Sequence, residues 1–493
     1  MSLRASLLRQ LDNPILNKNQ RAELGCDIAR QLEDVGDYEG AREAIGEFWR
    51  GLGERPQVAG LNESGAAEVL LRAGTLTGWL GNCTQANDAQ EQAKNLITEA
   101  ARIFGSLASQ KKVLEAQTEL AYCYWRQGEY DEARIILTEV IEQLSTDSAL
   151  KAKAVLRLAI VEGSANRYSD ALRILTDAAP LFEKITNYSI KGNYHNNLGV
   201  FLKNLAAFER REDYLDRAFV EYEAASYYFE QAGHMSYCAH VENNLGFILY
   251  KAGKYAEAHT HLDRARRIFS SLKDRGSAAQ VNDTRARVLL AEGRNEDAEK
   301  VARASVRALE SGGRQSVLAE ALTTHGAALA RLGMHEHAQQ AFYRAMDVAY
   351  QAGALNDAGG GALTLIEELG EHLPSDELQS LFGRALAWLE TSQHLQTLQR
   401  LCRAGRRVLA VRWKQGDLEA GRTGTLRESV QQHEKKLIRQ ALQRTDGSVT
   451  QAARLLGLSH QSLIAIIERR HRDLLTERKP KMRRKTNIIK WHT

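Results

Sequence analysis

The chain has 493 residues and a formal net charge of only +4, but the charge is unevenly distributed. From Arg427 to the end, 16 Lys and Arg stand against 6 Asp and Glu, a net charge of +10, so the preceding residues carry −6 of the total of +4. An acidic body with a basic end indicates nucleic-acid contact confined to the C-terminus. The five scattered cysteines, without CxxC spacing, argue against a disulfide scaffold or a zinc ribbon. No stretch is apolar enough for a signal peptide or a membrane span, so we expect a cytoplasmic protein without membrane contact.

Helical repeats account for most of the chain. A small residue recurs in the first helix of each predicted pair at intervals of 38, 40, 47, 40 and 40 residues: Ala121, Ala159, Gly199, Gly246, Ala286 and Gly326. A Gly-x-Tyr triplet, as in Gly128-Glu129-Tyr130 and Gly253-Lys254-Tyr255, marks the turn between two helices, and Ala follows three residues later. The interval of 47 reflects an insertion after Leu205. These positions predict paired helices that approach each other closely at the small residue.

At these positions the chain resembles the tetratricopeptide repeat, with units longer than the usual ~34 residues. The resemblance implies a right-handed superhelix of helical hairpins, about nine pairs in a domain of residues 1–392. The Trp that is usual at the fourth position of the repeat is absent, and His195 and Glu242 stand there. Residues 393–424 are predicted to form a capping helix to about Lys414 and a hinge from Gln415 to Gly424. We interpret Gly359-Gly360-Gly361 as a break between helices.

The first helix of each pair forms the concave wall of such a superhelix, and the resemblance implies which of its side chains face the groove. Carried onto this chain, the predicted peptide- or partner-binding residues are Asn193, Asn196, Asn197, Lys203, His240, Asn243, Asn244, Phe247, Tyr250 and Arg287. Further inward candidates are Tyr122, Trp125, Arg126, Lys153 and Arg157. An amide donates and accepts hydrogen bonds, so paired Asn residues can clamp the backbone of an extended peptide. The alternative is that these Asn only bond within the helices, since most side-chain hydrogen bonds go to backbone or water.

Patterns for catalysis and cofactor binding are missing from the sequence. GxxxxGK[ST], HExxH and GxSxG do not occur, so we expect no enzymatic activity and no cofactor. The nearest approach to a metal set is a group of His and Cys: His234, Cys238, His240, His259 and His261. This group lacks the paired ligand spacing of structural zinc sites, and we expect no bound metal.

Residues 425–472 predict three helices. The first, Leu426 to Arg444, has apolar residues near a 3.6-residue period, and Asp446-Gly447-Ser448 ends it. Thr450 to Leu456 predicts a short second helix, and a turn capped by Ser459 leads into the third, from His460 to about His471. Two short helices joined by a turn that contains Gly form a helix-turn-helix, whose second helix can enter the major groove of DNA.

The run Gly447-Ser448-Val449-Thr450-Gln451-Ala452-Ala453, followed by Leu456-Gly457-Leu458-Ser459 and Ser462-Leu463, resembles the Fis-type helix-turn-helix at the C-terminus of NtrC-like bacterial regulators. The resemblance and the local charge predict a DNA-binding site at Thr450, Gln451, Ser459, His460, Gln461, Ser462, Arg469, Arg470 and Arg472. Fis-type units pair through the preceding helix, which implies a homodimer with a seam at Leu426, Val430, Leu437, Ile438 and Ala441. The basic residues usual after Leu463 are replaced by Ile464, Ala465, Ile466 and Ile467. The basic tail, 473–493, is expected to be disordered and to contact phosphates.

The two resemblances together predict a transcriptional regulator. It would be all-α, with a repeat superhelix for a peptide or protein partner and a small C-terminal unit for double-stranded DNA. The competing interpretation is a non-enzymatic protein-interaction scaffold whose C-terminal helices only dimerise. The missing basic residues after Leu463 favour that second interpretation.

Overall fold

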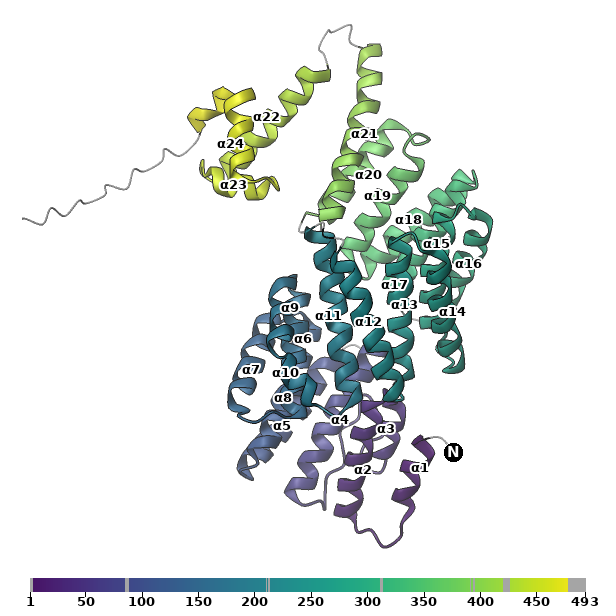
Figure 1. Ribbon diagram of the computed structural model, residues 1–493, viewed down its shortest axis with the longest axis vertical. Helices are drawn as coiled ribbons and strands as arrows, with labels where there is room; N and C mark the ends of the chain where they lie inside the picture. The colour runs from purple at the N-terminus through teal and green to yellow at the C-terminus, as the bar shows by residue number, and fades with distance from the viewer. Residues whose placement is uncertain are drawn as a thin grey trace, which may run out of the picture. The chain divides into compact units, whose positions relative to one another are not determined.

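The computed structural model describes residues 3–84, 88–209, 211, 213–310, 314–390, 392, 395–419 and 426–477. All regular secondary structure in these residues is helical, which confirms the predicted all-α class (Figure 1). None of the described helices is both long and apolar enough to cross a membrane. The chain divides into two compact units, Met1–Leu409 and Ala410–Thr493.

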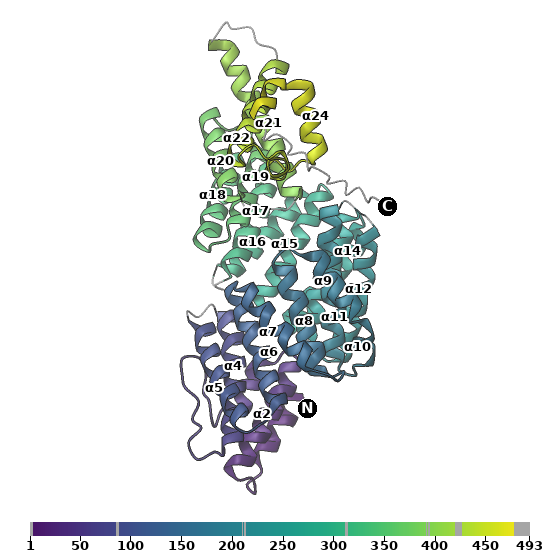
Figure 2. The ribbon, with the colours of Figure 1, turned by 90° about the vertical axis from the view of Figure 1, so that its left-hand side faces the viewer.

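The first unit is a right-handed superhelix of stacked helical hairpins (Figures 1 and 2). A short helix α1 (Leu3–Leu8) and a 3-10 helix η1 (Arg9–Asp12) precede the stack. The hairpins are α2 (Lys18–Asp34) with α3 (Tyr38–Ala44), α4 (Glu63–Thr84) with α5 (Ala89–Ser106), α6 (Gln110–Gln127) with α7 (Tyr130–Gln143), α8 (Ala149–Ser164) with α9 (Tyr168–Asp177) and a short α10 (Ala179–Lys184), α11 (Tyr188–Glu209) with α12 (Asp213–Gln231), α13 (Met235–Lys251) with α14 (Tyr255–Ser271), α15 (Arg275–Ala291) with α16 (Asn295–Leu309), α17 (Gln315–Arg331) with α18 (His335–Gln351), and α19 (Leu355–Leu369) with α20 (Ser375–Trp388). The insertion after Leu205 lengthens α11.

The small residue in the first helix of each hairpin is required by the packing. A Cβ on Gly199 would lie 2.9 Å from the Tyr222 ring, and one on Gly246 would lie 2.7 Å from Cγ of Leu262. Real Cβ atoms do not approach that closely, so a larger residue would force the two helices apart. The recurring small residue therefore sets the close spacing within each hairpin.

A buried polar cluster occupies the position of the missing Trp in the hairpin of α13 and α14. The Glu242 carboxylate is almost fully buried and accepts a hydrogen bond from Ser226 Oγ at 2.5 Å. It also pairs with His261 Nδ1 at 2.8 Å and with Arg264 Nη1 at 3.1 Å. Because three donors satisfy the carboxylate, hydrogen bonds here take over the role of aromatic packing.

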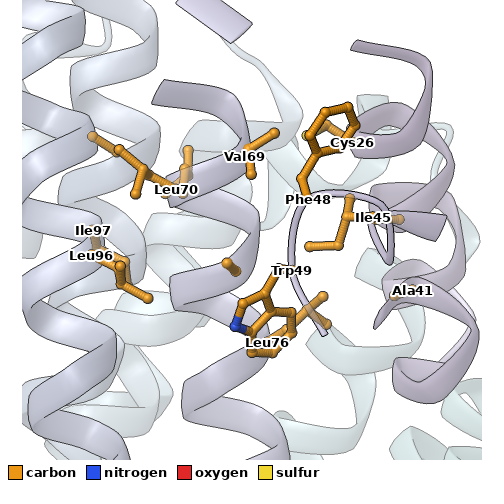
Figure 3. Close-up of a cluster of buried hydrophobic side chains, with 14 of the residues drawn as sticks. Cys26, Ala41, Ile45, Phe48, Trp49, Val69, Leu70, Leu76, Leu96 and Ile97 are labelled. Atoms are coloured by element: carbon orange, nitrogen blue, oxygen red, sulfur yellow. The ribbon is translucent and has the colours of Figure 1, made fainter. Parts of the chain in front are cut away.

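The first hairpins share one apolar core, although their repeat pattern is weak. Phe48 and Trp49, just after α3, are buried, and Trp49 lies beside Leu76 of α4 whereas Phe48 lies beside Cys26 of α2 (Figure 3). The indole Nε1 of Trp49 donates to the Glu54 carbonyl at 3.1 Å, which satisfies its one polar atom. This aromatic pair joins the N-terminal hairpin to the next one.

Two predictions about helix ends are wrong. Gly359-Gly360-Gly361 lies inside α19 rather than between helices, and a Cβ on Gly359 would overlap the Leu389 side chain. Close helix packing therefore outweighs the low helix propensity of Gly. The helix α21 (Leu395–Glu419) also continues through the residues predicted to begin the hinge, Gln415 to Asp417. Residues 420–424, the rest of that hinge, lie outside the described residues.

The second unit contains the predicted three helices and one more turn. These elements are α22 (Leu426–Arg444), α23 (Val449–Leu455), α24 (His460–Arg470) and the 3-10 helix η2 (Arg472–Glu477). Their shared core consists of Ile438, Ala441, Leu442, Ala452, Ala453, Leu463, Ile467 and Leu474. Because Leu474 is fully buried, the predicted start of a disordered tail at residue 473 is wrong. The expected tail from 478 to 493 lies outside the described residues.

Candidate DNA-binding helix and repeat cavities

Two tight turns position the helices of the C-terminal unit. Asp446 and Gly447 have φ values of 48° and 77° between α22 and α23, and Gly457 has a φ of 66° between α23 and α24. The Leu458 backbone N–H donates to the Ala453 carbonyl at 2.8 Å, which closes the second turn. Left-handed residues reverse the chain within a few positions, so α24 begins directly after α23.

The first turn of α24 is polar and faces solvent. Ser459 caps the helix by accepting a hydrogen bond from the Ser462 N–H at 3.0 Å, and His460 Nδ1 lies 3.3 Å from Thr450 Oγ1 on α23. The predicted residues at this end of the motif are all exposed: Thr450, Gln451, Ser459, His460, Gln461 and Ser462. Leu463 and Ile467, on the opposite face of α24, are fully buried. The helix is thus anchored on one side and presents its polar start on the other.

The predicted arginines differ in their surroundings. Arg470 Nη1 pairs with Glu434 Oε1 at 3.2 Å, and Glu434 also binds the buried His471 at 2.9 Å. Arg469 is exposed and has no ion pair with any described residue. Among the described residues, the exposed Arg472 donates only to the Glu468 carbonyl, at 3.0 Å. Arg469 and Arg472 therefore keep an unneutralised charge on the surface of this unit.

Only part of the predicted dimer seam is exposed and so can contact a second copy of the chain. Val430 and Leu437 are 49% and 44% exposed, as an unpaired apolar seam requires. Ile438 and Ala441 lie in the core of their own unit, at 3% and 5% exposure, so their assignment to the seam is corrected. Apolar spacing on α22 gave no means of distinguishing the two faces. The side chain of Leu426 lies outside the described residues.

A first cavity of about 490 Å³ lies in the repeat unit and contains most of the predicted Asn cluster. Asn193, Asn196, Asn197, His240 and Asn244 all line it. The amide nitrogen of Asn193 donates to the carbonyl of Ser189, and that of Asn197 to the carbonyl of Asn193, as the alternative interpretation of these residues expected. The amides of Asn196 and Asn244 have no hydrogen-bond partner among the described residues. These two amides remain free to bind a ligand.

Four aromatic rings form one wall of the first cavity. Tyr38 stacks on Trp79 with ring centroids 4.8 Å apart, Trp79 lies 5.1 Å from Tyr122, and Tyr122 lies 4.9 Å from Trp125. The guanidinium of Arg157 lies 4.6 Å from the Tyr122 centroid. Tyr122, Trp125 and Arg157 were among the inward candidates, whereas Tyr38 and Trp79 were missed. Their hairpins match the repeat pattern too weakly for the groove positions to be assigned from the sequence.

The charged and titratable groups around the first cavity are largely neutralised. Lys153 and Arg157 both pair with the buried Glu119, at 3.0 and 2.7 Å. Burial lowers the pKa of His234 and of His240 to about 4, so both rings are neutral at pH 7. The first cavity therefore offers aromatic faces and amides rather than a strong net charge.

The remaining predicted groove residues belong to a different place. Phe247, Tyr250 and Arg287 line a second cavity of about 480 Å³, which shares no lining residue with the first. Lys203 lies beside this second cavity, with its Nζ 5.8 Å from the Phe247 centroid. Asn243 lines neither cavity, and its Oδ1 is buried without a partner among the described residues. The predicted groove is thus divided into two separate sites.

The histidines considered for metal binding have other contacts. His234 Nδ1 accepts a hydrogen bond from the Tyr237 N–H at the start of α13, and His259 Nε2 lies 3.2 Å from Glu292. No cluster of three or more His, Cys, Asp or Glu suited to a metal ion occurs in the described part of the chain.

Comparison with known families agrees with both resemblances. Residues 429–465 match the model of the bacterial regulatory protein, Fis family, and residues 112–184 and 237–311 match the tetratricopeptide repeat. No curated protein sequence matches the chain. Several solved structures are similar to it. A Rap protein complexed with competence and sporulation factor has 15% identity and a TM-score of 0.48, covering 72% of this chain and 99% of that one.

Two further structures of this kind are the apo form of the quorum sensor NprR and the protein Tom70. NprR from B. thuringiensis has 11% identity and a TM-score of 0.47, covering 70% of this chain and 92% of that one. Yeast Tom70 has 14% identity and a TM-score of 0.44, covering 83% and 86%. The matched family models, together with the helices described above, show that the chain contains tetratricopeptide repeats and a C-terminal Fis-family helix-turn-helix, the composition of a DNA-binding regulator with a repeat domain.

Proposed function

We propose that the chain is a non-catalytic transcriptional regulator that binds duplex DNA as a homodimer and an extended peptide segment in the first cavity. The observation that carries the DNA-binding part is the first turn of α24, where four adjacent polar side chains, 459–462, are exposed. A Gln side chain can pair with adenine, whereas Ser and His are less selective. Arg469 and Arg472 supply charge for phosphate oxygens.

The test of base recognition uses the full chain and a pool of random duplexes. The His460→Ala, Gln461→Ala double variant is expected to lose sequence preference while its affinity for an unrelated duplex stays within about twofold, because base contacts specify and phosphate contacts position. The matched control is Gln440→Ala, an exposed Gln on α22. An unchanged preference in the double variant contradicts the proposal, as does an absence of duplex binding at low salt.

The peptide-binding part rests on Asn196 and Asn244, whose amides face the first cavity without a partner among the described residues. These amides can pair with a peptide backbone while the wall of Tyr122 and Trp125 packs against an apolar side chain. Each change to Ala is expected to weaken a peptide selected from a random library about fivefold, the usual value of one hydrogen bond. Asn204→Ala is the matched control, because Asn204 lines neither cavity and donates to the Val200 carbonyl. Equal binding by all three variants contradicts this assignment.

The second candidate is a protein-interaction scaffold, and exposed apolar side chains on the C-terminal unit favour it. Leu455 is 59% exposed and Leu458 is 38% exposed, in addition to Val430 and Leu437 on α22. The basic residues usual after Leu463 are also replaced by apolar ones. A dimer that binds no duplex at any salt concentration would support this candidate over the regulator.

A further inference from the structure

The second cavity lies between α13, α15, α17, α19 and α21, and its volume of about 480 Å³ is in the range of small-molecule sites. Most of its charged side chains already have partners. Arg287 pairs with Asp283 at 2.6 Å and with Glu320 at 2.9 Å, and Arg331 pairs with Glu368 at 2.9 Å. These pairs fix the walls of the cavity and leave little charge for a ligand.

Lys251 is the lining cation without an acidic partner among the described residues. Its Nζ lies 5.4 Å from the centroid of Phe247 and 5.1 Å from that of Tyr250. Lys251 is exposed at the mouth of the cavity, and partial desolvation, together with the charges of Arg287 and Arg400, lowers the pKa of its ammonium. A cation in these surroundings is stabilised by an anion placed in the cavity.

Asp357 is the corresponding lining acid. It stands in the first turn of α19, and its carboxylate has neither a hydrogen bond nor an ion pair with the described residues. Burial and the nearby charge of Glu320 raise the pKa of Asp357 to about 6. A cationic group placed between Asp357 and Glu320 would stabilise both carboxylates.

We propose that the second cavity binds a small zwitterion, a free α-amino acid or a short peptide with both ends free. Its carboxylate lies at Lys251, its ammonium lies at Asp357 and Glu320, and its apolar part packs on Phe247 and Tyr250. One such ligand accounts for both unpartnered charges, which a simple anion or a simple cation does not. Gly360 leaves room for it, because a Cβ there would meet nothing within 4 Å.

The position of Arg400 links this site to the C-terminal unit. Arg400 lines the second cavity, pairs with Glu367 at 2.7 Å and belongs to α21, which continues past Leu409 into the second unit. A ligand that rearranges these contacts acts on the helix that leads to the helix-turn-helix. This consequence for DNA binding rests on the proposed function, whereas binding of the zwitterion does not.

Calorimetry on the full-length chain tests the site. The probes are the twenty standard amino acids and the di- and tripeptides of Gly and Ala, each compared with its N-acetyl form, its C-terminal amide and inorganic phosphate. A zwitterion is expected to bind at least tenfold more tightly than either blocked form, because each blocked form leaves one charge unpaired. Free amino acids and short peptides are titrated separately, and the class that binds more tightly is the class of ligand that the site recognises.

Two variants assign each end of the ligand. Lys251→Met is expected to bind the zwitterion about tenfold more weakly and to lose the preference for it over the amide. Asp357→Asn is expected to lose the preference over the N-acetyl form instead. Lys254→Met, an exposed Lys outside the cavity, and Asn196→Ala in the first cavity are the controls and should bind as the parent does.

Three outcomes overturn the proposal: no probe binds, phosphate or an N-acetyl form binds as tightly as the zwitterion, or the variants bind as the parent does. DNA binding is measured on the same preparations, with thermal melting as the check of folding. Zwitterion binding by a chain that binds no duplex supports the site and contradicts only the proposed function.

Discussion

The ring of His234 lies directly against Gly36, so that a Cβ on Gly36 would overlap the imidazole. The two residues belong to turns far apart in the sequence, one between α2 and α3 and the other before α13. The end of α2 makes a second long-range contact with a different turn, a hydrogen bond from Asn187 Nδ2, just before α11, to Asp34 at 3.1 Å. Asp34 and His234 both line the first cavity, so these contacts close it on one side.

Gly36→Ala is therefore expected to push His234 away from the turn between α2 and α3. Gly36 has a φ of 77°, and the strain of a Cβ adds to its overlap with His234, for a predicted loss of about 2–4 kcal/mol in the free energy of unfolding. Gly293→Ala isolates the strain, since Gly293 also has a φ of 77° but has nothing within 4 Å of a Cβ. Denaturant unfolding of both variants measures the difference. Equal losses would show that the contact with His234 is unimportant for stability.

The buried pair of Arg157 in α8 and Glu119 in α6 joins two successive hairpins and should contribute strongly to stability. Arg157→Met leaves the buried Glu119 with Lys153 as its one remaining ion-pair partner among the described residues, and we expect a loss of about 3 kcal/mol in the free energy of unfolding at pH 7. Burial alone raises the pKa of Glu119, but the charges of Arg157 and Lys153 outweigh it and hold the pKa below its usual value. The stabilisation is therefore present above the unfolded-state pKa of about 4.3 and is lost at lower pH.

The loss caused by Arg157→Met should accordingly be smaller at pH 3 than at pH 7, as measured by urea unfolding at the two values. Arg173→Met removes an exposed pair with Asp170 and should cost less than about 1 kcal/mol at either pH. A difference between Arg157→Met and the parent that does not change with pH is the contrary result.

Asp357 has the opposite dependence on pH. Since its pKa is raised from 3.8 to about 6, its contribution to stability is full below pH 3.8 and is lost as the pH rises through 6. Asp357→Asn should therefore stabilise the chain at pH 7 by up to about 1 kcal/mol, reduced for partial exposure, and have little effect at pH 4. Thermal melts at the two pH values measure this, with Asp347→Asn, an exposed Asp on α18, as the control. Equal melting shifts at both values would contradict the raised pKa.

The two neighbouring arginines of α24 should differ in DNA affinity. Arg469→Ala removes an unpaired surface charge and should weaken binding to all duplexes alike, lowering the slope of log affinity against log salt by about 1. Arg470→Ala should cost less, because the Arg470 charge already pairs with Glu434. Salt titrations of both variants with one duplex measure the two slopes. A larger effect for Arg470 would mean that its pair opens on DNA.

The proposed dimer should depend on the exposed face of α22. Leu437→Glu places a charge on an apolar position that is 44% exposed and should shift the chain from dimer to monomer without unfolding it. Light scattering gives the mass, and the same change at Leu455 on α23 is the control. A dimer that persists in Leu437→Glu requires a different interface.

The repeats could be predicted from the sequence because each one needs a small residue at the same position. Ala or Gly must stand wherever two helices touch, as at Gly199 and Gly246, and that requirement leaves a regular spacing. The helix-turn-helix could also be predicted from the sequence, since its turns need residues with a left-handed backbone conformation at fixed positions. Both features depend on interactions within a few tens of residues.

The features that were missed depend on contacts between distant residues. The pairing of Asp34 with Asn187 and the packing of Gly36 on His234 leave no periodic pattern. Apolar residues on α22 follow one helical period, whether they face their own core, as Ile438 does, or solvent, as Leu437 does. Only the folded arrangement separates these two cases.

The three consecutive glycines of α19 make this helix dependent on its neighbours. Each Gly costs about 1 kcal/mol relative to Ala inside a helix, so an isolated segment of this sequence would not stay helical. Fraying should begin here, and the amide hydrogens of α19 should exchange with deuterium sooner than those of α17. Arg407 of α21 donates to the carbonyl of Ile366 in α19 at 3.0 Å. The helix expected to unfold most readily, α19, therefore also holds α21 in place.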